Sequence, residues 1–243
     1  SGIVETVSVI KSETELDYIR RAARISETGM QAGYAAISEG RSENDVAAES
    51  YYAMVKAGSE FFNLQPVVTA GEKTGIAHSN FHRGVLKQGD SVMLELGAVW
   101  NRYAGPLFRT AAVGTVTGEL RKMYDACANS LEATLEAIKP GALSQDVQKA
   151  AQDVINFYGY EKNFRKRVGY CFGVGFPPDW GQGYIMDLKH HDERQLKTGM
   201  VFHIAPALRE LGRFGVACSE TVAVTESGVE VITNFPRELF ISR

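Results

Sequence analysis

The chain has 243 residues, enough for one large domain with a single core or for two small domains. Apolar residues make up 44% and charged residues 23% of the sequence, the usual shares in a globular protein. The net charge of −3 argues against a nucleic-acid partner, and no stretch approaches the roughly 18 apolar residues of a membrane span. The spacings of Cys127, Cys171 and Cys218 suit neither a zinc site nor a disulfide framework, so we expect reduced thiols and a cytoplasmic protein.

Two helices are predicted first in the chain. Ser12 and Glu15 have the spacing of a capping box, and apolar residues follow at helical intervals as far as Met30. Ser42 and Asp45 repeat this pattern at the start of a second helix, which we expect to end near residue 58. A β-rich region comes next, with strands predicted at residues 66–69, 91–97 and 111–116.

The second half of the sequence repeats this order of elements. A helix is predicted at residues 118–138, and Pro140-Gly141 stops it. Ser144 is predicted to cap a further helix that ends near Gly159. The remaining strands are expected at residues 167–176, 200–205, 215–225 and 229–233.

A short internal match supports a duplicated unit. Leu86-Lys87-Gln88-Gly89 leads into the predicted strand that ends at Glu95, and Leu196-Lys197-Thr198-Gly199 leads into the one that ends at Ala205. With the repeated element order, this match favours a single α+β domain over residues 1–243. Its two pseudo-symmetric halves, about residues 12–116 and 117–233, would pack around a shared, curved sheet.

Several motifs stand at specific spacings. They are Glu95-Leu96-Gly97, Tyr103 to Thr110, Gly199-Met200-Val201 with Pro206, and Ser219-Glu220-Thr221. His78 precedes Glu95 by 17 residues. This combination resembles the pita-bread family of creatinase, prolidase and the methionine and proline aminopeptidases, over about residues 12–225. The resemblance implies the pita-bread fold with a mainly antiparallel sheet.

The metallopeptidases of that family bind two metal ions through two Asp, one His and two Glu side chains. The matching positions in this sequence are Glu95, Pro106, Tyr170, Ala205 and Ser219. Divalent cations need several oxygen or imidazole ligands each, and neither Pro106 nor Ala205 has a ligand side chain. A one-residue shift that brings Glu220 to the last position would still supply only two acids. We therefore expect no metal and no cofactor.

One glycine-rich and aromatic stretch resembles a particular branch of this family. Phe172-Gly173-Val174-Gly175-Phe176-Pro177-Pro178-Asp179-Trp180 suggests either a wall for a small, flat substrate or a core segment with tight turns. Together with Glu95 and Pro106 at two ligand positions, it resembles the ectoine hydrolases, which open a cyclic amidine. The resemblance implies a C-terminal catalytic domain without the family's smaller N-terminal domain, and a homodimer in the full-length form.

The same resemblance implies roles for individual residues. Glu95 would attack the cationic amidine carbon, directly or through a water molecule, and His78 would protonate the departing nitrogen. Tyr170 would hydrogen-bond the substrate or orient Glu95. The substrate-binding candidates are Phe176, Trp180, Arg109, Arg167, Ser219 and Glu220, with Arg209 and Arg213 as further candidates for a substrate carboxylate.

The predicted function is therefore metal-independent hydrolysis of a C–N bond in a small cyclic amidine such as ectoine. Three alternatives stay open: a creatinase-like amidinohydrolase, an Xaa-Pro peptidase-like protein with a degraded metal site, and a non-catalytic binding module. The joint presence of Glu95 and His78 favours an enzyme, because a decaying site is expected to collect arbitrary polar residues.

Overall fold

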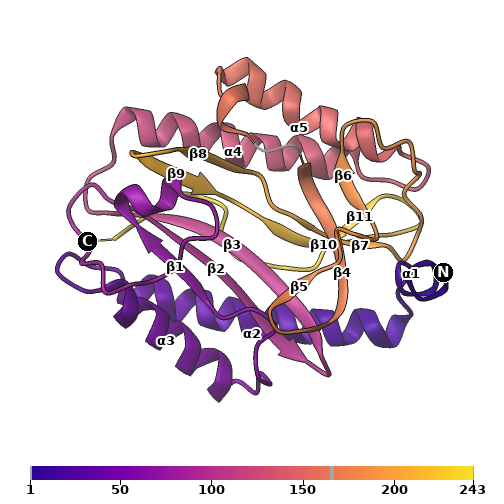
Figure 1. Ribbon diagram of the computed structural model, residues 1–243, viewed down its shortest axis with the longest axis horizontal. Helices are drawn as coiled ribbons and strands as arrows, with labels where there is room; N and C mark the ends of the chain where they lie inside the picture. Colours follow the sequence, from indigo (N-terminus) through magenta and orange to yellow (C-terminus); the bar gives the residue numbers. More distant parts are fainter. Residues whose placement is uncertain (1, 165–166, 243) are drawn as a thin grey trace.

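A computed structural model describes residues 2–164 and 167–242, and Figure 1 shows two pairs of long helices with strands between them. The helices are α1 (Ile3–Ser8), α2 (Glu13–Ala36), α3 (Glu43–Lys56), α4 (Gly118–Ala137) and α5 (Ser144–Tyr158). Strands β1 (Val67–Ala70), β2 (Ser91–Trp100) and β3 (Tyr103–Val113) follow α3. After α5 come β4 (Arg167–Phe176), β5 (Asp179–Gly181), β6 (Asp187–Lys189), β7 (Val201–Ile204), β8 (Ala207–Glu210), β9 (Phe214–Ala217), β10 (Glu220–Val224), β11 (Val229–Val231) and β12 (Phe240–Ser242).

One large sheet runs through the molecule. Within the described residues it has ten strands, with β1-β2-β3-β4-β7-β10-β11 as its main path. Strands β5 and β6 pair with β4, and β12 pairs with β3 in parallel, whereas the other pairs in this sheet are antiparallel. Strands β8 and β9 form a separate small sheet. The mixed architecture with a mainly antiparallel sheet confirms the expected fold class.

Local signals in the sequence locate the starts of the first two long helices. The Ser12 Oγ accepts from the backbone N–H of Glu15, whose carboxylate accepts from the Ser12 N–H at 2.8 Å. Ser42 and Asp45 form the same reciprocal pair at the start of α3. Both predicted capping boxes are therefore confirmed. The prediction that Ser144 caps α5 is wrong, because its hydroxyl donates instead to the Asp187 carbonyl at 2.9 Å.

Two strand predictions are corrected by long-range pairing. Strand β3 begins at Tyr103 rather than at residue 111, because it pairs with β2 from Trp100↔Tyr103 to Ser91↔Ala112. The single strand expected at residues 215–225 is two strands, β9 and β10, separated by Cys218 and Ser219. The chain changes sheets here: β9 pairs with β8, whereas β10 pairs with β7 and β11.

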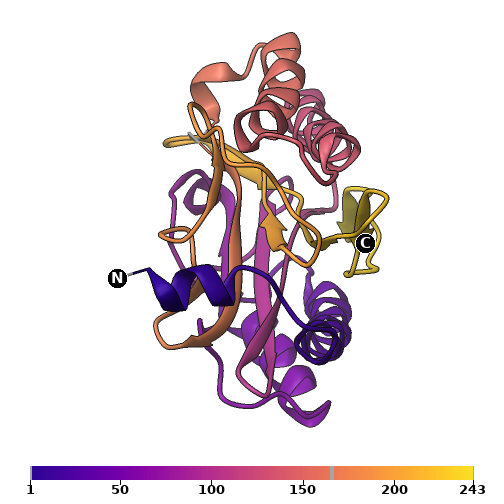
Figure 2. The ribbon, with the colours of Figure 1, turned by 90° about the vertical axis from the view of Figure 1, so that its right-hand side faces the viewer.

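Each helix pair packs on its own part of the sheet, and Figure 2 shows the two pairs at opposite ends of the molecule. Residues of α2 and α3 share a buried cluster with Val92, Leu94 and Leu96 of β2. Residues of α4 and α5 share another with β4, β7 and β10. No helix within the described ranges has both the length and the apolar content needed to cross a lipid bilayer.

The contact between α2 and β3 is close enough to require glycine. A Cβ atom at Gly105 would lie 2.2 Å from the backbone nitrogen of Ala23 and 2.6 Å from its Cα. Backbone atoms on a well-packed helix cannot move aside as a flexible side chain can. Gly105 therefore allows α2 to lie directly on the strand that pairs with β2.

Gly105→Ala is expected to lower the free energy of unfolding by about 1–3 kcal/mol, because the added methyl group forces α2 away from β3. Gly118→Ala is the matched control, since a Cβ there has no neighbour within 4 Å and alanine favours the helix. Urea unfolding of both variants measures the difference. Equal stability of the two variants would contradict the proposed packing constraint.

Candidate functional site

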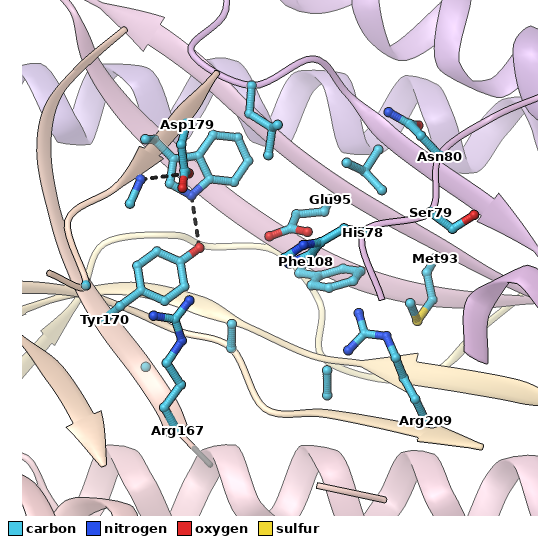
Figure 3. Close-up of a pocket in the computed structure, with 18 of the residues that line it drawn as sticks. His78, Ser79, Asn80, Met93, Glu95, Phe108, Arg167, Tyr170, Asp179 and Arg209 are labelled. Carbon is cyan, nitrogen blue, oxygen red and sulfur yellow. Dashed lines mark hydrogen bonds between the residues drawn. The ribbon is translucent and has the colours of Figure 1, made fainter. Parts of the chain in front are cut away.

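A pocket of about 490 Å³ lies beside β2 (Figure 3). Met93 and Glu95 of β2 line it, so Leu94 and Leu96 face the other side of the strand. The first three strands and the loop after β1 line one side of it, and β4, β5 and the segment after β7 line the other. Side chains that line it and bear on its chemistry are those of Val67, His78, Asn80, Met93, Glu95, Phe108, Arg167, Tyr170, Asp179, Trp180, Ala205 and Arg209.

Glu95 lies in a cross-strand row on the pocket side of the sheet. Val67 of β1 and Phe108 of β3 are its direct partners in the antiparallel register. Side chains at paired positions lie on the same face, so the row Val67–Glu95–Phe108 forms one wall of the pocket. The carboxylate is partly buried and has apolar neighbours on both sides.

His78 reaches the pocket from the loop after the 3₁₀ turn η1 (Gly71–Gly75). Its backbone φ is 58°, in the left-handed region that residues other than glycine rarely adopt. Such a conformation persists only where the surroundings enforce it.

A buried carboxylate holds the loop that carries His78. Glu43, at the start of α3, is fully buried and accepts backbone N–H bonds from Ala70, His82 and Gly84 at 2.9, 2.9 and 3.1 Å. It also forms an ion pair of 2.5 Å with Lys73 Nζ. One side chain thus ties together both ends of the segment in which His78 lies.

Tyr170 and Trp180 form the opposite wall of the pocket. The Trp180 Nε1–H donates to the Tyr170 hydroxyl at 3.0 Å, as Figure 3 shows. The indole packs on β2 at Gly97, where a Cβ would lie 2.6 Å from the ring. Burial, and then the charge of Glu95, raise the pKa of Tyr170 well above its ordinary value, so the hydroxyl stays protonated.

His203 of β7 is a residue of the site that the sequence reasoning missed. It pairs with Tyr170 across the strands, and its Nδ1 lies 2.8 Å from the Tyr170 hydroxyl. The ring is fully buried, and burial lowers its pKa to about 3, with Arg109 and Arg167 as smaller causes. The sequence holds one signal for His203. Side chains two residues apart in a strand face the same side, and His203 lies two residues before Ala205, which lines the pocket.

Charged groups of both signs surround the pocket. Glu95 and Asp179 supply carboxylates, and Arg167 and Arg209 supply guanidinium groups. Arg167 lies over the Tyr170 ring at 4.7 Å and pairs with Asp187 at 2.7 Å. Figure 3 shows Arg167 beside Tyr170 and Arg209 on the other side of Glu95. The pocket therefore offers complementary charges to a small molecule that carries both signs.

Arg109, Ser219 and Glu220 do not line this pocket, contrary to their expected role in substrate binding. Phe108 faces the pocket, so its neighbour Arg109 points to the other face of β3. There Arg109 is fully buried and pairs with Glu220 at 2.7 Å. The Ser219 hydroxyl accepts from the Phe108 N–H at 2.7 Å and lies 2.7 Å from His203 Nε2. These groups join the two parts of the sheet.

Phe176 and Arg213 also lie away from the pocket lining. Phe176 is 59% exposed at the end of β4, where the Arg102 guanidinium covers its ring at 4.9 Å. Arg213 pairs with Glu119 at 2.6 Å on the surface. Tyr170 reaches the pocket from the middle of β4, whereas Phe176 is the last residue of that strand and follows a register shift between Phe172 and Phe176.

The five positions that would hold two metal ions do not supply a matching set of ligands. Three of them, Glu95, Tyr170 and Ala205, line the pocket, whereas Pro106 does not, and Ser219 is engaged with His203. Among the residues of the described ranges, no group of three or more His, Cys, Asp and Glu side chains is placed to hold a metal ion. The donor set does not fit a dinuclear centre.

Comparison with known proteins relates this chain to one family of hydrolases. The sequence model of metallopeptidase family M24 matches residues 17–226. The Xaa-Pro dipeptidase of Pyrococcus furiosus is 29% identical over 98% of this chain and 66% of its own length. The ectoine hydrolase of Halomonas elongata is 29% identical over 99% of this chain and 62% of its own length.

The solved structures agree with this relationship. The Xaa-Pro dipeptidase from Bacillus anthracis superimposes with a TM-score of 0.92 at 28% identity, over 100% of this chain and 66% of that one. This similarity confirms the pita-bread fold. The chain spans about three-fifths to two-thirds of the length of the curated relatives that it matches.

Glu43→Gln is expected to loosen the loop that carries His78, because it removes the charge that pairs with Lys73 and weakens the three backbone hydrogen bonds. Hydrogen–deuterium exchange in peptides that cover residues 70–84 should accelerate at least several-fold. Glu49→Gln, on the exposed face of the same helix, is the control and should leave this exchange unchanged. Unchanged protection in Glu43→Gln would show that another contact holds the loop.

Proposed function

The chain belongs to metallopeptidase family M24, and we propose that it is a metal-independent hydrolase that opens a C–N bond of a small cyclic amidine such as ectoine. The observation that carries this proposal is the pocket in which Glu95 and His78 occur together although the family's metal-ligand set is incomplete. The 29% identity to an ectoine hydrolase agrees with it. No step of the proposed reaction passes through a metal ion.

A cyclic amidine suits a pocket of this kind. Its amidinium form is cationic at neutral pH, so its central carbon is already electrophilic and needs less activation than a peptide carbonyl. Glu95 attracts the cation and can attack that carbon, either directly or by deprotonating a water molecule. Its apolar neighbours Val67 and Phe108 keep competing water away from the carboxylate.

The proposed reaction passes through a covalent bond between the substrate and Glu95. An oxygen of Glu95 forms a bond to the amidine carbon, and the C–N π electrons move onto a ring nitrogen. His78 then gives a proton to the nitrogen that departs as the C–N bond breaks. Water next attacks the carbon bound to Glu95, and His78 takes one of its protons. The Glu95 carboxylate then departs as the C–O bond breaks, and the remaining hydroxyl proton passes to the freed amine, so that the products are an open-chain amide and an ammonium group.

The two arginines of the pocket support a substrate that also carries a carboxylate. Arg209 and Arg167, which also pairs with Asp187, both line the pocket, whereas Arg109 and Arg213 do not. A guanidinium group binds a carboxylate through paired N–H donors. We therefore assign carboxylate binding to Arg167 and Arg209, and binding of the amidinium to Glu95.

A second candidate is peptidase activity on Xaa-Pro dipeptides. The identity to the Xaa-Pro dipeptidase of Pyrococcus furiosus, also 29%, favours it, and a dipeptide too has charges of both signs. A peptide carbonyl, however, is neutral and needs a Lewis acid or an equivalent group for attack by water. The side chains at the family's metal-ligand positions do not fit a metal ion that could act as this Lewis acid, so we rank this function second.

Glu95→Gln is expected to lower turnover of the cyclic amidine by about 10³-fold or more, roughly 4 kcal/mol in the activation barrier, because the amide is a poor nucleophile and a poor base. Proton NMR of ectoine, creatine and Xaa-Pro dipeptides incubated with parent and variant identifies the substrate and the rates. Glu226→Gln, at an exposed turn, is the matched control and should keep full activity. Amidine turnover that survives in Glu95→Gln would overturn the role of this residue, and cleavage of the dipeptides alone would favour the second candidate.

Chelator treatment tests the metal-independent mechanism. Amidine turnover should persist in EDTA, and the purified protein should contain well below one equivalent of Mn, Co, Zn or Fe by mass spectrometry, because two ligand positions carry no ligand side chain. Loss of activity in EDTA, with recovery on addition of one of these ions, would contradict the mechanism.

A further inference from the structure

A chain of hydrogen bonds runs from the pocket wall into the interior. The Tyr170 hydroxyl accepts from Trp180 Nε1–H at 3.0 Å and lies 2.8 Å from His203 Nδ1. On the other side of the imidazole, Nε2 lies 2.7 Å from the Ser219 hydroxyl, which accepts from the Phe108 N–H at 2.7 Å. Tyr170, His203 and Ser219 are therefore each held by a neighbour on both sides.

The charge of the imidazole is settled by its surroundings. His203 is fully buried, and burial together with the nearby guanidinium groups of Arg109 and Arg167 lowers its pKa to about 3. The ring is consequently neutral over the physiological range, with one N–H donor and one acceptor nitrogen. Only two arrangements of the protons along the chain are then possible.

In the first arrangement Tyr170 donates to Nδ1 and Nε2–H donates to Ser219. The Ser219 oxygen would then accept two hydrogen bonds, from His203 and from Phe108, and its own hydrogen would have no acceptor among its contacts with the described residues. An unmade hydrogen bond in a fully buried place is costly.

In the second arrangement Ser219 donates to Nε2 and accepts from Phe108, so both functions of its hydroxyl are used. His203 Nδ1–H donates to the Tyr170 oxygen, which also accepts from Trp180. Both of these donors point at the oxygen, so the hydroxyl hydrogen of Tyr170 is left for an acceptor in the pocket that this residue lines. This arrangement is favoured because its unused hydrogen faces a pocket where water or substrate can accept it, whereas the first arrangement leaves a hydrogen of the fully buried Ser219 without an acceptor.

We propose that His203 is a positioning residue that, as its Nδ1–H tautomer, makes Tyr170 a hydrogen-bond donor to the bound substrate. The donor would serve the atom that gains electron density when the carbon beside Glu95 is attacked, and this consequence rests on the proposed hydrolase function. A donor fixed before the reaction stabilises such charge without reorganisation. The Ser219 hydroxyl, which is held by the Phe108 N–H, acts here through His203.

The tautomer is measured by ¹⁵N NMR on protein labelled in its histidine rings, without any substrate. Two-bond couplings to the ring C–H protons distinguish a protonated Nδ1 from a protonated Nε2, and His203→Gln identifies the signals of this ring. We expect Nδ1–H and a bare Nε2 from pH 6 to 8. An Nε2–H tautomer or a doubly protonated ring would overturn the proposal. Because no substrate is needed, this failure is separate from a failure of the proposed function.

Kinetics of a double-mutant cycle test the consequence for catalysis. Tyr170→Phe should lower kcat by about 100- to 1,000-fold, the usual effect of losing one such donor, and His203→Leu should approach the same loss. The double variant should lose little more, because both changes remove one interaction. His203→Asn, which keeps an N–H near the position of Nδ1, should recover part of kcat. Losses that multiply in the double variant would show that His203 does not act through Tyr170.

Discussion

Leu94 and Leu96 are fully buried against the α2–α3 helices, and this burial holds the β2–β3 hairpin in one register. Side chains alternate along a strand, so a slip of one residue would bring leucine into the pocket and Glu95 into the core. Either exchange is strongly unfavourable, because it exposes apolar surface and buries a charge. The position of the acid is thus a consequence of where the leucines must lie.

Polar groups join the parts of the sheet behind the pocket. Arg109 pairs with Glu220 and also donates to the carbonyls of Phe235 and Pro236, so its charge is satisfied in a fully buried place. Removing one partner of such a pair leaves a buried charge uncompensated, at a cost of about 3–5 kcal/mol. These side chains are therefore held in the framework of the sheet.

Local features of the fold could be predicted from the sequence, and features set by distant partners could not. The capping box of Ser12 and Glu15 depends on residues three apart, so its pattern is visible in the sequence. The extension of β3 to Tyr103 and the break at Ser219 depend on which strand pairs with which. Such pairings join residues that lie far apart in the chain, and no periodicity encodes them.

The same distinction applies to the candidate site. Glu95 and His78 stand in motifs with specific spacing, and both line the pocket. The residue types of Arg109 and Phe176 suit substrate binding, but their directions depend on the face of β3 and on the register shift near the end of β4. His203 was missed because a histidine within an apolar strand has no partner in its own segment, and its partners Tyr170 and Ser219 come from other strands.

The packing of Trp180 gives the protein an internal optical reporter. The chain has two tryptophans, and the other, Trp100, lies at the end of β2 beneath Arg21 at 5.3 Å. Trp180 is 1% exposed, lines the pocket, and donates its indole N–H to Tyr170, which also lines the pocket. Indole fluorescence responds to nearby charge and hydration, so the emission of a Trp100→Phe protein arises from the pocket wall alone. Occupancy of the pocket can thus be followed by light, even by molecules that the protein does not transform.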